Sequence, residues 1–155
     1  TTMVKLKFGI PVLGRLIKHS EIARITRTLG TLLASDVPLV KALAQTELVA
    51  GSAYVRSALE DMRIGIEQGA TVATAAGRVE FFSPLVYHLL SAGQVSGCLE
   101  DSLLQIADIY EEEVDNGTRL LTSLLEPALL LIMGAIIAVI VSAILLPILE
   151  MNKFF

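Results

Sequence analysis

The stretch PALLLIMGAIIAVIVSAILLPIL, which runs from Pro127 to Leu149, contains no charged side chain. A helix rises about 1.5 Å per residue, so a helix of this length spans roughly 34 Å. The hydrocarbon core of a bilayer is about 30 Å thick. A buried helix of a water-soluble protein rarely runs this far without a polar face. The stretch therefore predicts a single transmembrane helix, with the preceding residues forming a domain held at a membrane surface.

Length and composition agree with one small domain and one span. The chain has 155 residues, a formal net charge of −4 and a single cysteine, Cys98. This acidic balance gives no reason to expect nucleic acid as a partner, and one cysteine excludes an internal disulfide. We expect four parts: a basic and apolar juxtamembrane segment over residues 1–19, a helical bundle domain over 20–122, a transmembrane helix over 123–150 and a short tail over 151–155.

The segment ahead of the predicted bundle, from Met3 to Lys18, mixes apolar residues with lysines and Arg15. A basic, apolar segment of this kind can lie in the headgroup region of a membrane. A linker packed on its own domain fits the same composition. The sequence leaves both interpretations open.

The predicted domain shows helical periodicity from Ser20 onward, with apolar residues at spacings of three and four. Nothing alternates with a period of two over a useful length, so no strand is predicted. Breaks rich in Gly, Ser and Pro separate six amphipathic helices, which we expect to begin at Ser20, Pro38, the residues after Ser52, Thr71, Ser83 and Cys98. Short connections between such helices favour an all-α, antiparallel bundle of about six helices followed by the transmembrane helix.

Catalytic machinery is absent from the sequence. It has no glycine-rich phosphate loop with Lys-Ser/Thr and no His-Glu-x-x-His motif. His19 and His88 stand alone, and the apolar surroundings of His88 predict a hydrogen-bonded core or interface residue. The carboxylates between Asp101 and Glu113 lack the spacing of a calcium loop. We therefore expect no catalytic residue, no metal site, no cofactor and no enzymatic activity.

Motifs in three regions of the chain resemble a known family: RTLGTLLAS (27–35) with VPL (37–39), GQVSG (93–97) with IADIYEEEV (106–114), and LEP (125–127) with LPI (146–148). In this order they are similar to the inner-membrane platform proteins of type II secretion systems and type IV pilus machines, the GspF or PilC family. Members of that family carry two copies of the helical domain and usually three spans. The resemblance therefore implies that this chain corresponds to the C-terminal half.

The resemblance implies a non-enzymatic scaffold in the bacterial inner membrane, with the helical domain in the cytoplasm and the C-terminus in the periplasm. The implied partners are a cytoplasmic assembly ATPase, pilin or pseudopilin subunits, other inner-membrane platform proteins, further copies of the chain in a homo-oligomer and the lipid bilayer. A helical subunit of a transporter or channel is the alternative. A conduction path would require polar residues inside the span, and Ser142 is the only one between Pro127 and Leu149.

Two positions depart from the family pattern, which commonly has Gly at the position of Asp36 and Glu at the position of Gln94. Asp tolerates turn geometry and can partly replace a glycine. The change at Gln94 removes a carboxylate from the predicted closing turn. This weakens the case for a bound cation there.

One face of the last helix of the domain is acidic, because its acids recur at spacings of seven, four and three with one more beside them: Asp101, Asp108, Glu112 and Asp115, with Glu111 adjacent. Few of these acids have a basic residue three or four positions away. An unneutralised stripe creates a negative field that can steer and orient a basic partner. We expect it to meet the ATPase or a neighbouring protomer, with a merely solubilising surface as the alternative.

The apolar stretch carries two further features. Gly134, Ala138 and Ser142 recur every four residues and form a small-residue stripe that allows another helix to approach closely. Pro127 and Pro147 each remove a backbone hydrogen bond from a helix, so they predict a bend, or a helix start near Leu125. Glu126 is then expected at the cytoplasmic interface, either hydrated or paired with Arg119.

Overall fold

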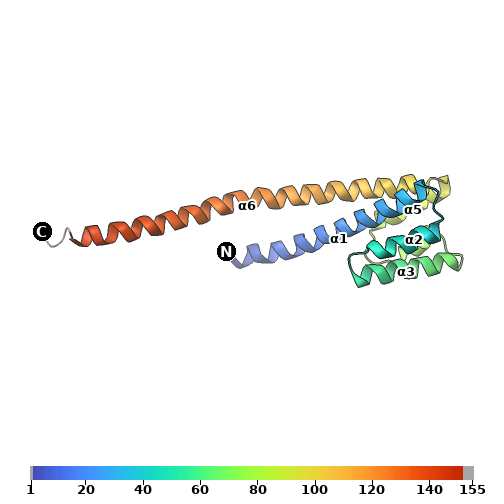
Figure 1. The fold of residues 1–155 in the computed structure, drawn as a ribbon, viewed down its shortest axis with the longest axis horizontal. Coiled ribbons are helices and arrows are strands. Elements are labelled where there is room, and N and C mark those ends of the chain that lie inside the picture. The colour runs from blue at the N-terminus through green and yellow to red at the C-terminus, as the bar shows by residue number, and fades with distance from the viewer. Residues whose placement is uncertain (1, 152–155) are drawn as a thin grey trace. The chain divides into compact units, whose positions relative to one another are not determined.

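The computed structural model describes the backbone of residues 2–151 and the side chains of residues 13–148. All regular elements in this described part are helices, which confirms the predicted all-α class (Figure 1). Their bounds are α1 (Thr2–Ala34), α2 (Leu39–Val49), α3 (Ala53–Glu67), α4 (Val72–Gly77), α5 (Pro84–Ser96) and α6 (Leu99–Met151).

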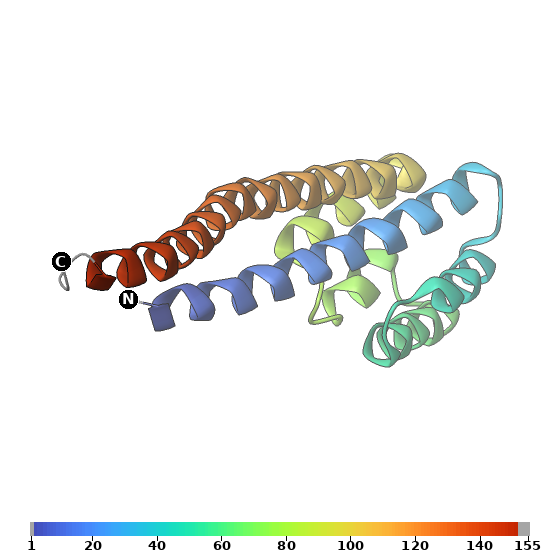
Figure 2. The ribbon, with the colours of Figure 1, turned by 60° about the vertical axis from the view of Figure 1, so that its left-hand side comes forward.

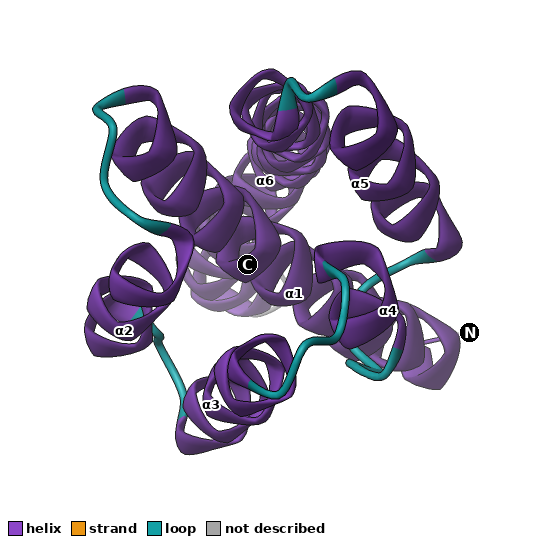
Figure 3. Ribbon diagram, turned by 90° about the vertical axis from the view of Figure 1, so that its right-hand side faces the viewer, coloured by secondary structure: helices purple, strands orange, loops and turns teal. Residues whose placement is uncertain are grey.

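The chain forms two compact units, one up to Asp115 and the other from Asn116 onward. The first unit contains α1 to α5 and the first part of α6, and each helix from α1 to α5 packs against the next one in the chain. Figure 3 shows α2, α3, α4 and α5 following one another around this bundle. The second unit is the remainder of α6.

Short loops join the helices of the first unit (Figure 2). Several of these turns are closed by capping residues that the sequence places there. Ser52 precedes α3, and its Oγ accepts a hydrogen bond from the backbone N–H of Val55 at 3.2 Å. Thr71 caps α4 by accepting from the N–H of Thr74 at 3.1 Å. Gly97 ends α5 in a left-handed conformation, with φ of 75°.

Asp36 occupies another left-handed turn, with φ of 60°, and is the one non-glycine residue of the described chain with positive φ. The N–H of Val37 donates to the carbonyl of Leu32 and the N–H of Asp36 donates to that of Leu33, both at 3.0 Å. This pattern ends a helix with a left-handed residue, which is most often glycine. The conformation explains why Asp, which tolerates this region of φ and ψ, replaces the expected glycine.

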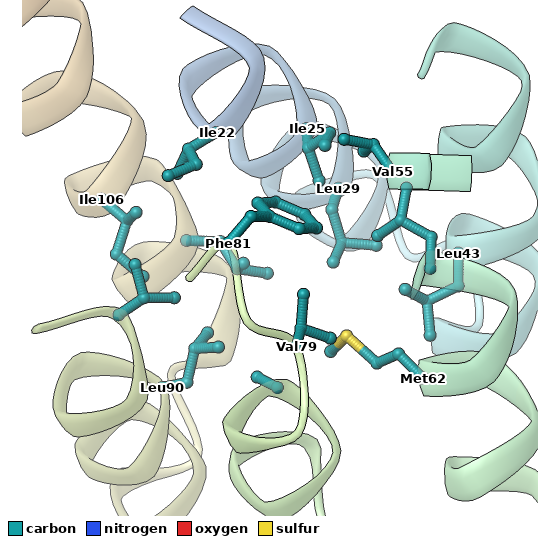
Figure 4. Close-up of a cluster of buried hydrophobic side chains, with 14 of the residues drawn as sticks. Ile22, Ile25, Leu29, Leu43, Val55, Met62, Val79, Phe81, Leu90 and Ile106 are labelled. Carbon is teal, nitrogen blue, oxygen red and sulfur yellow. The ribbon is translucent and has the colours of Figure 1, made fainter. Parts of the chain in front are cut away.

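The core of the first unit contains side chains from every helix, and the apolar stripe predicted for α1 faces it. Ile22, Ile25 and Leu29 are buried on α1, where they meet Leu43 of α2 and Ile106 of α6 in the same cluster (Figure 4). Burying one such side chain stabilises the fold by about 1.5–3 kcal/mol. This shared core holds α1 and the first part of α6 in fixed positions, and these two helices carry the candidate site.

The start predicted for the first helix is wrong, because Ser20 lies inside α1 instead of capping it. A capping residue favours a helix start, but it does not interrupt a helix when no Gly or Pro accompanies it. No Gly or Pro occurs from Arg15 to Leu29, so the juxtamembrane segment and the first predicted helix form one element.

A helix start near Leu125 is also wrong, because α6 continues from Leu99 to Met151 with Pro127 and Pro147 inside it. Proline costs one backbone hydrogen bond, and the leucine-rich sequence on both sides is strongly helix-forming. A bend at either proline stays a prediction.

The second unit contrasts with the bundle because the described residues form no core around its apolar side chains. Among the described residues, α6 is the one helix that is long and apolar enough to cross a membrane, and none of its most apolar window is buried within the chain. Leu131 and Val139, for example, are 75% and 69% exposed. The predicted span thus remains a candidate span on grounds of length and composition.

Candidate functional site

The predicted acidic face lies on the part of α6 that belongs to the first unit, and its members are all exposed: Asp101, Asp108, Glu111, Glu112 and Asp115. Leu103 and Ile106 of the same helix are buried in the core. The helical period therefore separates an apolar face from an acidic one, as the spacing predicts.

Arg27 of α1 neutralises part of this face. Its Nε donates to Oε1 of Glu111 at 3.0 Å, and its Nη2 donates to Oε2 of Glu111 at 2.7 Å and also to Oδ1 of Asp108. Such a fork gives two aligned, charge-assisted hydrogen bonds to one carboxylate. The hydrogen bonds to Glu111 and Asp108 raise the pKa of Arg27 above its ordinary value, and the bonds to Glu111 have the larger effect. Because the guanidinium is 37% exposed, solvent screening limits the gain in stability to about 0.5–1 kcal/mol.

The expectation that these acids lack basic neighbours is thus wrong for Asp108 and Glu111. That expectation rested only on residues three or four positions away in the same helix. Arg27 lies 84 positions before Glu111 in the sequence. Within the described residues, Asp101, Glu112 and Asp115 form no ion pair. The face therefore consists of a neutralised pair and three exposed, unpaired carboxylates.

A second link between α1 and α6 involves His19, which the sequence did not single out for a role. Its Nδ1 lies 2.8 Å from Oε2 of Glu113, and its ring meets the ring of Tyr110 edge-on at 5.1 Å. The hydroxyl groups of Tyr110 and Ser83 are hydrogen-bonded at 2.6 Å. Ser83 was expected to cap α5, yet it makes no side-chain cap bond and instead ties the start of α5 to α6.

A groove of about 370 Å³ lies between α1 and α6 beside the fork, with Arg24 and Thr28 on one helix and Val114 and Asp115 on the other. Exposed carboxylates at its edge suit a lysine or arginine of a partner, because close opposite charges steer binding and fix orientation. The arrangement can bind a basic surface.

Arg63 of α3 is engaged by two carboxylates within the bundle. Nε of Arg63 donates to Glu47 of α2 at 2.7 Å, and its Nη1 donates to Glu67 at 3.0 Å. Both hydrogen bonds raise the pKa of Arg63, and the bond to Glu47 has the larger effect. The neighbouring Glu60 and Asp61 are exposed acids away from the α6 face, so they offer a matched control.

The sequence singled out Gln94 and His88, and the structure shows what each of them contacts. Oε1 of Gln94 accepts a hydrogen bond from the N–H of Ala73 at 3.3 Å, which ties α5 to the start of α4. His88 is exposed and meets the ring of Tyr87 edge-on, so it is not the core residue that its apolar neighbours suggested.

The predicted features of the apolar stretch are all exposed within the chain. Nothing lies within 4 Å of a Cβ built on Gly134, and Ala138 and Ser142 of the same stripe are exposed. Glu126 is exposed too, and no ion pair joins it to Arg119. The stripe is therefore exposed within the described part of the chain, and packing against another helix stays a prediction.

Comparisons with known proteins place the chain in a family. The family model for the type II secretion system (T2SS), protein F, matches residues 25–147. The chain is 35% identical to the type IV pilus assembly protein PilC of Thermus thermophilus, and 35% identical to the type II secretion system protein F of Pseudomonas aeruginosa. These alignments cover 92% and 93% of the chain and 36% of each relative, so the chain spans about a third of their length. The chain belongs to the type II secretion system protein F family.

Proposed function

We propose that this chain is a non-enzymatic scaffold of an inner-membrane platform that serves a type II secretion or type IV pilus assembly machine. The family match and the names of its relatives support this role. The candidate span of α6 supports a membrane location. In this proposal α6 crosses the inner membrane, the bundle lies in the cytoplasm and the C-terminus lies in the periplasm.

The scaffold couples a cytoplasmic assembly ATPase to the polymerisation of pilin or pseudopilin subunits through its acidic face. The observation that carries this step is the exposed and unpaired state of Asp101, Glu112 and Asp115, next to carboxylates that Arg27 already neutralises. Arg27 holds α6 against α1, so the free acids are presented on a rigid surface. A basic surface of the ATPase, or of a neighbouring protomer, fits this charge.

Charge reversal tests the proposal when it spares the residues that Arg27 binds. The variant Glu112→Lys/Asp115→Lys, introduced at the native gene, should abolish secretion or piliation and leave helicity and membrane insertion unchanged. The control Glu60→Lys/Asp61→Lys changes the net charge equally, on exposed positions of α3. Full activity of the first variant, or equal loss in both, would show that the α6 acids only solubilise the domain.

The small-residue stripe serves the scaffold by packing α6 against another membrane helix. Close approach of backbones is a main source of helix association in lipid. Gly134→Leu should therefore weaken association of protomers on native gels of detergent-solubilised protein. Ile136→Leu, on another side of the same helix, is the control that conserves volume. An unchanged oligomer in the Gly134 variant would leave the stripe without a packing role.

A further inference from the structure

A groove of about 310 Å³ that the proposed function does not use lies between α1 and the connection from α2 to α3. Ile17 and Lys18 of α1 line one side, and Tyr54 and Phe81 line another. The ring of Tyr54 meets that of Phe81 edge-on at 6.3 Å. Phe81 is buried and belongs to the core, so it fixes the position of the groove.

The rim of this groove exposes large apolar side chains. Leu13, Ile17 and Tyr54 are 51%, 63% and 56% exposed. Leu13 and Ile17 are four residues apart and therefore neighbours on one side of α1. These three residues form what we call the apolar rim.

Positive charge accompanies the apolar rim. Lys18 lines the groove, and Arg15 lies one turn earlier on α1, beyond Lys18 and on the side of the helix away from Leu13 and Ile17. Both are exposed, and neither forms an ion pair within the described residues. Glu21, the acid of the groove, is already engaged, because it pairs with Arg24 and accepts a hydrogen bond from the N–H of Gly51. The free charge at the rim is therefore positive, in contrast to the acidic face of α6.

This part of α1 lies beside α6 within the first unit. The contact between His19 and Glu113 places this part of α1 beside the last turns of α6 in the first unit. Because α6 is continuous, about 18 Å of helix separates Asp115 from Pro127. The chain that leaves the first unit at Asp115 therefore enters the apolar stretch after a short length of helix.

We propose that the apolar rim, with Arg15 and Lys18, is a membrane-contact surface that docks on a bilayer containing anionic lipid. Apolar and aromatic side chains enter the boundary between headgroups and acyl chains, while lysine and arginine extend their charges to the lipid phosphates. Each cation near an anionic surface adds attraction that salt weakens. The proposal rests on the proposed span of α6.

A fluorescent label at position 17 tests the proposal in the full chain. Ile17→Cys in a Cys98→Ser background carries an environment-sensitive probe, and the chain is reconstituted in vesicles of phosphatidylcholine with or without phosphatidylglycerol. Cys98 is exposed, and about 24 Å of α6 separates it from Asp115, so the probe on Cys98 of the unsubstituted chain is the aqueous reference. We expect a blue shift at position 17 with phosphatidylglycerol, and its reversal at high salt.

Charge variants test whether Arg15 and Lys18 are the cations that attract the anionic lipid. Arg15→Gln/Lys18→Gln should reduce the blue shift by about half or more. Lys41→Gln/Arg78→Gln removes the same charge from exposed positions elsewhere and should preserve the shift. A probe at position 17 that stays as water-exposed as the probe on Cys98 in both lipids would overturn the proposal. So would a shift in phosphatidylcholine alone that grows with protein density, because it would indicate a second copy of the chain as the occupant.

Extraction with alkaline carbonate separates this inference from the proposed span. A chain that resists extraction, but whose probe at position 17 stays aqueous, would retain the span and contradict the membrane-contact surface. A chain that is extracted would contradict both.

Discussion

Two of the isoleucines of helix α6 have opposite surroundings: Ile106 lies in the first unit and Ile137 in the second. Ile106 is fully buried, whereas Ile137 is 56% exposed. In the first unit, apolar residues form one stripe and five other helices supply the core that covers it. In the second unit, apolar residues surround the helix and the described part of the chain does not cover them. The same side-chain chemistry is thus buried in a protein core in one part of α6, and in the other part it forms a candidate membrane span.

The largest effect should come from the isoleucine in the core. Ile106→Ala removes buried methyl groups and leaves a cavity, so it should lower the free energy of unfolding of the bundle by about 2–5 kcal/mol. Ile137→Ala, the same change on the same helix, should leave that free energy within about 0.5 kcal/mol. Urea unfolding in mild detergent, followed by tyrosine fluorescence, measures both. Equal destabilisation by the two variants would refute the contrast between the units.

Two helical glycines sharpen the same comparison. A Cβ on Gly93 of α5 would overlap the side chain of Ser102 of α6 and lie 3.1 Å from the carbonyl oxygen of Cys98, whereas nothing lies near Gly134. Gly93→Ala should therefore destabilise the bundle by about 1–3 kcal/mol, because α5 and α6 must separate. Gly134→Ala should leave the unfolding of the bundle unchanged. Thermal unfolding by circular dichroism measures this pair, and a stable Gly93 variant would contradict the close packing of α5 on α6.

The smallest effect concerns the fork between α1 and α6. Arg27→Met removes the charge and keeps much of the side-chain length, so the bundle should lose about 0.5–1 kcal/mol. The folded protein raises the pKa of Arg27, so this stabilisation is fully present below the ordinary arginine pKa and is lost only in strongly alkaline solution. Urea unfolding at pH 7 and pH 9 should therefore give the same difference. A difference that vanished at pH 9 would contradict the role of the guanidinium.

The fold was predictable where one local pattern determined the outcome. The apolar stripe from Ile22 to Leu29 is buried, and the breaks at Thr71 and Gly97 occur as the residue types indicate. The length of α1 was not predictable from capping preferences, because Ser20 is compatible with both a helix start and a helix interior. Pro127 likewise disfavours a helix without preventing one when the flanking residues favour it.

The candidate site was predictable only in part, for a related reason. Helical spacing alone places the acids of α6 on one exposed face. It does not show that Arg27 reaches Glu111, or that His19 reaches Glu113, since both contacts depend on how α1 packs against α6. Long-range ion pairs of this kind leave no periodic pattern within either helix. Because of these ion pairs, the proposed partner-binding face is no longer a uniformly acidic stripe. It consists of three unpaired carboxylates beside a neutralised pair.

A spin-label scan along α6 tests the central claim, that one helix is part of a protein core and then part of a bilayer. Single cysteines in a Cys98→Ser chain reconstituted in vesicles would carry the label at exposed positions from Asp101 to Asp115 and from Leu129 to Ile148. We expect labels in the first range to collide mainly with a water-soluble nickel complex, and those in the second mainly with oxygen, with the greatest oxygen preference near Val139. High accessibility to nickel throughout the second range would contradict the membrane span, and with it the proposed platform role.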